Sequence, residues 1–121
     1  MDTKFVSFIR STLRRASFRW APRGVAEKKA RVPHGFYKNG KQKYGYQCAE
    51  CKKVFQKKDT CVDHIVPVIG PEGFTTFDEM IKRMFCEADN LQILCNIPDG
   101  CHKKKTKAET TARAEVRRRN K

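Results

Sequence analysis

Two short apolar segments in the middle of the chain decide its fold. Residues 60–68 read TCVDHIVPV, and residues 90–95 read NLQILC. Their β-branched and aliphatic residues are typical of short buried strands, although the polar pair Asp63 and His64 interrupts the first segment. Between them, the order Thr-Phe-Asp-Glu at 76–79 is a capping box that predicts a helix over 77–85. A second helix is expected to begin at Cys101, so the sequence predicts a small α+β domain.

Four cysteines flank these segments in two pairs. Cys48 and Cys51 have the C-x-x-C spacing of a zinc knuckle, and five residues separate Cys95 from Cys101. Two such pairs can converge on one tetrahedral zinc ion, and the turn-forming residues 96–100 can bulge outward without moving the sulfurs. A disulfide framework is the alternative, which the lack of a secretory signal disfavours. The remaining two cysteines are interpreted as small buried residues or spare thiols: Cys61 and Cys86.

The charge of the chain indicates a polyanionic partner. Its 121 residues are enough for one domain, and they carry 27 Lys and Arg against 13 Asp and Glu, a formal net charge of +14. Residues 1–47 hold 12 basic and 2 acidic residues, residues 48–101 hold 6 and 9, and residues 102–121 hold 9 and 2. Basic arms around a slightly acidic centre favour nucleic acid as the partner, the alternative being a solvated surface. No apolar run approaches the roughly 20 residues of a membrane span.

The first 20 residues predict an amphipathic basic helix. Apolar residues recur at three- or four-residue spacing, namely Phe5, Phe8, Ile9, Leu13, Ala16 and Trp20. Between them lie arginines that we expect to contact DNA phosphates: Arg10, Arg14, Arg15 and Arg19. A mitochondrial presequence has a similar composition, whereas a secretory signal is excluded because Arg10 interrupts the only apolar run. Prolines and glycines at 21–35 predict a linker.

Residues 36–46 predict a β-hairpin. Asn39 and Gly40 can supply the positive φ angles of a tight turn between its strands. Aromatic residues alternate there with lysines that are candidates for DNA contact: Lys38, Lys41 and Lys43. This pattern suits a strand pair lying on nucleic acid, and it suits a half-buried hairpin as well.

Asp63, His64 and His102 are polar residues in or next to the predicted strands and the last helix, and each can have a purely structural role. Neighbouring residues of a strand point to opposite faces, so Asp63 and His64 reach one site only at a distorted strand end. His102 can alternatively replace one of the cysteines as a zinc ligand, and His34 is interpreted as a surface or phosphate contact. The start of the last helix carries further candidate phosphate contacts: Lys103, Lys104, Lys105 and Lys107.

Together, these motifs resemble those of the HNH endonucleases. The matching elements are Cys-x-x-Cys at 48–51, Asp-His-Ile-x-Pro at 63–67, Asn-Leu-Gln-x-Leu-Cys at 90–95 and Cys-His-x-x-Lys-Thr at 101–106. The resemblance covers about residues 48–109 and departs from the family pattern in three extra residues between the last two cysteines. It implies the ββα-metal (His-Me finger) fold, a two-stranded antiparallel hairpin backed by a helix. The small size and basic arms resemble those of free-standing phage-encoded members.

The resemblance also implies roles for individual residues. His64 would be the general base that takes a proton from water. Asp63 and His102 would ligate one divalent ion, which could be Mg²⁺, Mn²⁺, Ni²⁺ or Zn²⁺. Asn90 would orient the hairpin loop and His64 by hydrogen bonds. We therefore expect a basic helix and linker over 1–35 and a zinc-stapled nuclease domain over 36–121.

The function that follows is metal-dependent hydrolysis of DNA phosphodiester bonds, leaving 5′-phosphate and 3′-hydroxyl ends. The expected partner is double-stranded DNA, in the cytoplasm of a bacterial host if the chain is phage-encoded. A second copy of the chain or a phage packaging or replication protein is a further expected partner, and a membrane is not. Two alternatives stay open: a zinc-ribbon nucleic-acid-binding accessory protein without cleavage activity, and a membrane-active basic protein.

Overall fold

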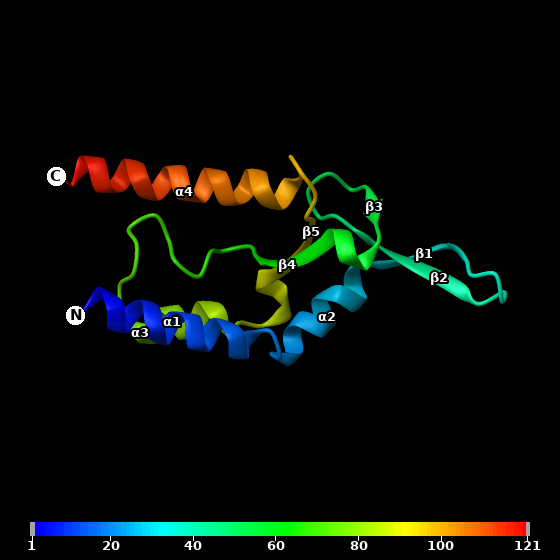
Figure 1. The fold of residues 1–121 in the computed structure, drawn as a ribbon, viewed down its shortest axis with the longest axis horizontal. Helices are drawn as coiled ribbons and strands as arrows, with labels where there is room; N and C mark the ends of the chain where they lie inside the picture. Colours follow the sequence, from blue (N-terminus) through cyan, green and yellow to red (C-terminus); the bar gives the residue numbers. More distant parts are fainter. Residues whose placement is uncertain (1, 121) are drawn as a thin grey trace.

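The structure is a computed structural model that describes residues 2–120 as a small α+β domain (Figure 1). The described residues form four α-helices, which are α1 (Thr3–Ser17), α2 (Ala21–Ala30), α3 (Phe77–Met84) and α4 (Cys101–Arg119). One antiparallel sheet consists of β1 (Arg31–Phe36), β2 (Gln42–Gln47) and β3 (Val54–Phe55). The second antiparallel sheet consists of β4 (Thr60–His64) and β5 (Leu91–Cys95). The predicted α+β class is therefore confirmed.

The two-stranded sheet of β4 and β5 lies at the centre of the domain. The strands pair with Asp63 opposite Gln92 and His64 opposite Leu91. Leu94 in β5 is almost fully buried, and the helix α2 covers this sheet. The first strand ends at His64, whereas the sequence predicted strand up to residue 68. Pro67 has no N–H group to offer a ladder of hydrogen bonds, so the chain turns away before it.

The predicted capping box is confirmed at the start of α3. The Thr76 hydroxyl accepts a hydrogen bond from the Glu79 backbone N–H at 3.2 Å. Met80 and Met84, one helical turn apart, are both 2% exposed, so this helix buries one face. The helices α1 and α3 lie side by side, and the rings of Phe5 and Phe77 pack edge to face across them with their centroids 6.0 Å apart (Figure 1).

The linker predicted over residues 21–35 is wrong. Residues 21–30 form α2, and the strand β1 begins at Arg31. Pro22 lies in the first turn of α2, where no N–H donor is required, and Pro33 lies on β1, an edge strand that tolerates proline. Ala26 of α2 is buried, and α2 contacts β4 and β5. The N-terminal segment is therefore packed on the central sheet.

The hairpin predicted over residues 36–46 is confirmed, but its turn differs from the prediction. Tyr37 N–H donates to the Lys41 carbonyl at 2.9 Å, and Gly40 N–H donates to the Tyr37 carbonyl at 2.9 Å. Only Gly40 has a positive φ, 85°, whereas Asn39 does not; its side-chain oxygen accepts from Lys41 N–H instead, at 3.0 Å. This is a three-residue loop that ends in one left-handed residue. The hairpin projects away from the rest of the domain (Figure 1).

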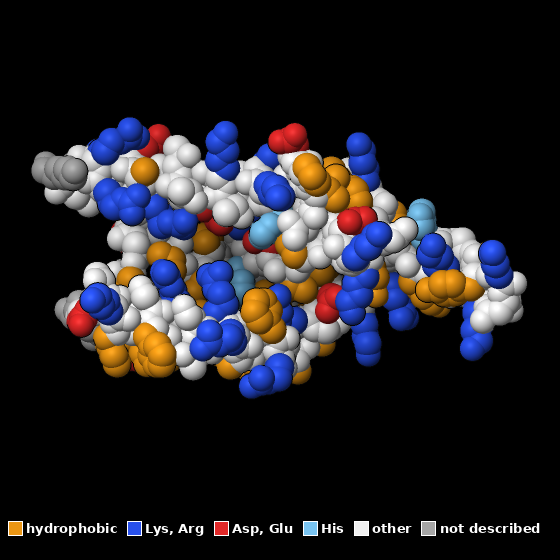
Figure 2. Space-filling view, in the orientation of Figure 1, with side chains coloured by type: hydrophobic (Ala, Val, Ile, Leu, Met, Phe, Trp, Pro, Cys, Tyr) orange, Lys and Arg blue, Asp and Glu red, His pale blue; other side chains and the backbone are white. Residues whose placement is uncertain are grey.

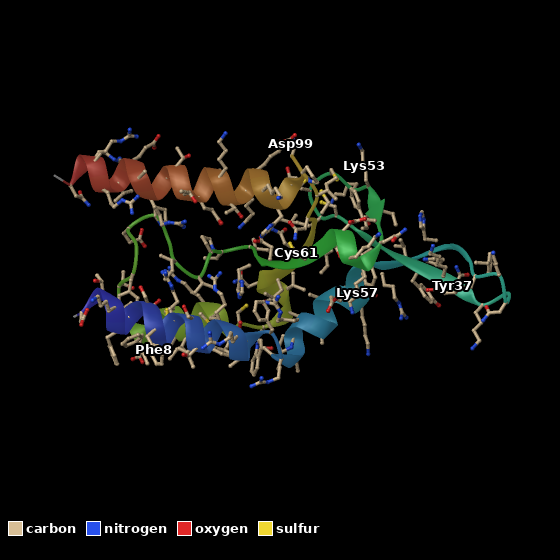
Figure 3. All side chains as sticks on the ribbon, viewed as in Figure 1. Phe8, Tyr37, Lys53, Lys57, Cys61 and Asp99 are labelled. Atoms are coloured by element: carbon tan, nitrogen blue, oxygen red, sulfur yellow. The ribbon has the colours of Figure 1, made fainter. Side chains whose placement is uncertain are left out.

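The predicted amphipathic helix is present as α1, with one correction. Phe8 is 66% exposed and points away from the domain, outside the apolar face to which the sequence assigned it (Figure 3). Ile9 and Leu13 are half-buried, so the inward stripe is narrower than predicted. Trp20 anchors the end of this segment, because its indole N–H donates to the Cys86 carbonyl at 2.6 Å. None of the helices in residues 2–120 has the length and apolar character needed to cross a membrane.

Candidate functional site

The four cysteines predicted to bind zinc come together in the structure. The sulfur atoms of Cys48, Cys51, Cys95 and Cys101 all lie within 4.8 Å of one another. Four sulfurs placed about 2.3 Å from one ion at the corners of a tetrahedron lie about 3.8 Å apart. A slight contraction would therefore bring the cluster to the geometry of a structural zinc site. The four thiols could hold a metal ion such as zinc.

The first cysteine pair lies in a tight turn after β2. Lys52 N–H donates to the Cys48 carbonyl at 3.0 Å, and Cys48 N–H donates to the Lys53 carbonyl at 2.9 Å. Lys52 adopts a left-handed conformation with φ of 66°, which closes the turn. This backbone arrangement turns both sulfurs of the pair toward β5 and the start of α4.

The second pair closes a longer loop between β5 and α4. Cys101 N–H donates to the sulfur of Cys95 at 3.2 Å. The extra residues bulge outward, as predicted, through a turn in which Gly100 N–H donates to the Ile97 carbonyl at 2.9 Å (Figure 3). Asp99 in this turn has φ of 58°. Cys101 is the first residue of α4, so the cluster fixes where that helix begins.

The pKa values of two thiols of the cluster are shifted in opposite directions. Burial raises the pKa of Cys48, but hydrogen bonds from the backbone of Cys51, Cys95 and Glu50 outweigh it and lower the pKa to about 7. Burial and hydrogen bonds to the neighbouring sulfurs raise the pKa of Cys101 to about 12. Four thiolates this close together would repel one another, so a dication is needed to compensate them.

The cysteines outside the cluster, Cys61 and Cys86, are half-buried, so the prediction that Cys61 is a buried residue is wrong. All six cysteines are free in the structure, and none forms a disulfide. Burial and the charge of Asp63 raise the pKa of Cys61 to about 11, so it remains a thiol at neutral pH. Cys86 is half-buried at the end of α3.

Asp63 and His102 meet beside the cluster. Asp63 Oδ1 lies 3.9 Å from His102 Nε2, and the Asp63 side chain is only 11% exposed. Its other oxygen, Oδ2, accepts from Gln92 Nε2 at 3.1 Å and lies 3.1 Å from Lys105 Nζ. One carboxylate oxygen is thus held by the protein, and the other faces an imidazole nitrogen. His102 follows Cys101 directly, so the cysteine cluster positions it.

His64 follows Asp63 as the last residue of β4, and its ring contacts the end of α3. Its Nε2 lies 3.0 Å from the Met84 carbonyl at the end of α3. A carbonyl can only accept, so the neutral ring carries its proton on Nε2 and leaves Nδ1 as the basic nitrogen. Within the described residues, no hydrogen bond or ion pair joins this ring to Asp63 or His102.

Asn90 holds the chain just after His64. Its backbone carbonyl accepts from Ile65 N–H at 2.9 Å, and its side-chain oxygen accepts from Val66 N–H at 3.0 Å. Its side-chain nitrogen donates to the Val66 carbonyl at 3.4 Å. Three hydrogen bonds from one residue therefore fix the direction in which β4 leaves the sheet.

The basic residues line a recess between α4 and the layer of α1 and α3, which we name the cleft (Figure 2). Lys and Arg side chains cover both of its walls, and histidine side chains lie at its bottom (Figure 2). Most of the predicted phosphate contacts on α1, on the turn after it and on α4 are exposed: Arg14, Arg15, Arg19, Lys103, Lys104 and Lys107. Arg10 is half-buried on α1.

Lys105 differs from the other predicted phosphate contacts. Its ammonium group donates to the His64 carbonyl at 2.9 Å and to Glu109 Oε2 at 2.6 Å, besides its contact with Asp63. Burial lowers the pKa of Lys105, but Glu109 and Asp63 outweigh it and raise the pKa above its ordinary value. Lys105 thus points into the site. The sequence analysis missed this network. The four-residue spacing of Lys105 and Glu109 on a helix could have indicated their ion pair.

Comparisons of this chain with protein-family models, with curated proteins and with solved structures find no match. The site is therefore interpreted from its own chemistry.

Proposed function

We propose that this protein is a metal-dependent DNA endonuclease of the HNH class. The observation that carries the proposal is the pairing of Asp63 Oδ1 with His102 Nε2, 3.9 Å apart. Ligand bonds of about 2.1 Å on each side span at most about 4.2 Å, so one divalent ion fits between the two atoms. An almost buried carboxylate that turns an oxygen toward an imidazole nitrogen suits cation binding.

The arrangement of the central sheet and α4 supports the same proposal. The antiparallel strands β4 and β5 are followed directly by a helix whose second residue is His102, which is the order of a ββα-metal fold. A bound divalent ion would contact the scissile phosphate and stabilise the leaving oxygen. Asp63 and His102 would hold it, while Gln92 and Lys105 keep the second carboxylate oxygen in place.

His64 is proposed as the general base. Its hydrogen bond to the Met84 carbonyl fixes the ring and leaves Nδ1 able to accept a proton from water. Asn90 supports this role because it holds the residues that follow His64 with three hydrogen bonds. Transfer of one proton from water to His64 would give the hydroxide that attacks phosphorus. The bond from phosphorus to the 3′ oxygen then breaks, and this oxygen takes a proton from solvent to become the 3′-hydroxyl.

The basic walls of the cleft support a nucleic-acid substrate. Lys and Arg side chains lie on both sides of the recess, with histidine side chains at its bottom (Figure 2). A phosphate backbone in this position would be neutralised by both walls at once. Double-stranded DNA is therefore the proposed substrate.

Supercoiled plasmid incubated with the purified protein and Mg²⁺ or Mn²⁺ tests the proposal. We expect nicked or linear plasmid on a gel, and no product from Asp63→Ala or His102→Ala at the same metal concentration. Raising the metal concentration should partly restore these variants. A retarded band without cleavage would instead support a nucleic-acid-binding accessory protein. Leakage of dye-loaded anionic vesicles without any effect on plasmid would support a membrane-active protein.

A further inference from the structure

The hairpin of β1 and β2 presents an aromatic and basic face that no other part of residues 2–120 covers. Pro33 pairs with Tyr44, and Phe36 pairs with Gln42 across the hairpin. Residues opposite one another in a sheet point to the same side, so Phe36 and Tyr44 share one face. Phe36 is 70% exposed and Tyr44 is 42% exposed, large values for aromatic rings. The hairpin extends away from the central sheet (Figure 1).

A cationic side chain lies on one of these rings, and a second lies on another ring of the hairpin. The guanidinium carbon of Arg31 lies 4.2 Å from the centroid of the Tyr44 ring. On the same hairpin, Lys43 Nζ lies 5.9 Å from the centroid of the ring of Tyr37, which is itself 56% exposed (Figure 3). Residues 28–49 contain six basic residues and no acidic residue. The surface therefore combines exposed rings with an uncompensated positive charge.

We propose that this hairpin face binds unpaired nucleotides of single-stranded nucleic acid, as a surface separate from the cleft. Exposed rings next to lysine and arginine are the side chains that hold single strands, because each base offers a flat face for stacking and each phosphate needs a cation. Bases inside a duplex are already stacked on one another and cannot reach the rings. The hairpin would thus direct the protein to DNA with an unpaired segment.

The binding of a fluorescein-labelled 20-nucleotide thymidine strand, measured by anisotropy without added divalent metal, tests this inference. Phe36→Ala and Tyr44→Ala should each weaken single-strand binding by about 5- to 100-fold, the effect of losing one stacked base. Their affinity for a 20-base-pair duplex should change less than about twofold. Tyr44→Phe keeps the ring and should bind like the natural chain.

Phe18→Ala is the matched control. Phe18 is 62% exposed and lies under Arg23, 5.1 Å from the guanidinium carbon to the ring centroid, but it lies outside the hairpin. Its removal should leave single-strand binding unchanged.

Two results would overturn the inference. In the first, the hairpin variants bind the single strand normally. In the second, they lose affinity for the single strand and the duplex equally, which would place duplex DNA on the hairpin. Dissociation of a dimer in Phe36→Ala, measured by sedimentation, together with normal strand binding would assign the face to a second copy. Because the assay needs no cleavage, it stands whether or not the cleft is catalytic.

Discussion

At the scale of single residues, Asp63 shows how the two oxygens of one carboxylate can differ. Oδ2 is occupied by Gln92 and Lys105, whereas Oδ1 faces His102. A carboxylate held in this way has lost its rotational freedom before any ligand arrives, which reduces the entropy lost when a cation binds. The strands β4 and β5 each contribute one side chain to this arrangement, and α4 contributes two, His102 and Lys105.

His64→Ala tests the proposed base. We expect the variant to fold, retain bound zinc and bind DNA, because the ring donates only one hydrogen bond to the Met84 carbonyl. Plasmid cleavage should fall by about two to four orders of magnitude, the usual contribution of general base catalysis. His34→Ala, which removes an exposed histidine from the hairpin, serves as the control and should cleave normally. Near-normal cleavage by His64→Ala would remove His64 from the mechanism.

Lys105→Met should destabilise the fold, because it leaves the charges of Asp63 and Glu109 without their partner. We expect a loss of about 1–2 kcal/mol in the free energy of unfolding at pH 7, measured with urea. The pKa of Lys105 is raised in the fold, so this stabilisation is complete below the ordinary lysine pKa and disappears as the pH rises through the raised one. Lys105→Arg keeps the charge and should retain most of the stability. Equal stability of the methionine variant at pH 7 would show that the network contributes nothing.

At the scale of elements, the loop between β5 and α4 depends on a glycine. A Cβ atom at Gly100 would lie 2.9 Å from both Ile97 Cγ1 and the Ile97 carbonyl oxygen. Gly100→Ala should therefore cost about 1–3 kcal/mol of stability and weaken zinc retention, since Cys101 follows directly. Gly24→Ala is the control, because no described atom lies within 4 Å of its Cβ position in α2. It should raise stability by about 0.5–1 kcal/mol, and thermal unfolding of the two variants should move in opposite directions.

Elements with local signals could be predicted from the sequence, and those with tertiary causes could not. The capping box at Thr76, the strand over 91–95 and the paired cysteines each depend on neighbours in the chain. The helix α2 was missed because Pro22 and Gly24 usually break helices, yet proline is harmless in a first turn and α2 is stabilised by its contact with the central sheet. Phe8 was assigned to the wrong face because helical spacing alone does not show how narrow the buried stripe is.

The candidate site, too, could be predicted from the sequence only in part. The meeting of Asp63 with His102 was expected from the motifs alone. The direction of the His64 ring toward Met84 was not, because it depends on where α3 ends relative to β4, across 20 residues of sequence. Lys105 was predicted to contact phosphate like the neighbouring lysines, and only the tertiary structure reveals its three acceptors within the protein.

At the scale of the whole molecule, the cysteine cluster joins the first half of the chain to the second. Removing the metal with a chelator should unfold the protein, because binding energy at a structural zinc site is folding energy. Protons compete with zinc for thiolates, so zinc retention should fall as the pH is lowered. Metal analysis and circular dichroism over a pH series measure both effects. A fold that is unchanged after complete metal removal would contradict a structural role.

The net charge of +14 and the exposed arginines near the N-terminus predict a strongly salt-dependent affinity for DNA. Replacing Arg14, Arg15 and Arg19 by Gln should reduce the slope of log affinity against log salt by up to about 0.9 for each phosphate that is no longer neutralised. Folding should be unaffected, because all three side chains are exposed, those of Arg14 and Arg15 on α1 and that of Arg19 just after it. Lys53→Gln is the control, since Lys53 lies next to β3 and away from the cleft (Figure 3). If the slope of log affinity against log salt is unchanged in the triple variant, the helix α1 serves only to pack against the domain.

The long helix α4 has a further consequence for the molecule's motions. Its 19 residues include no buried side chain, and its last turn carries Arg117, Arg118 and Arg119. Among the residues of α4 that follow Lys105 in the sequence, only Arg113 makes a described hydrogen bond to the rest of the domain. It donates to the Ile69 carbonyl at 3.5 Å. Amide protons in the final turns should thus exchange with solvent at a small opening free energy, far faster than those of β5. A polyanion lying along the helix would slow this exchange, so the C-terminal turns would become rigid only when the cleft is filled.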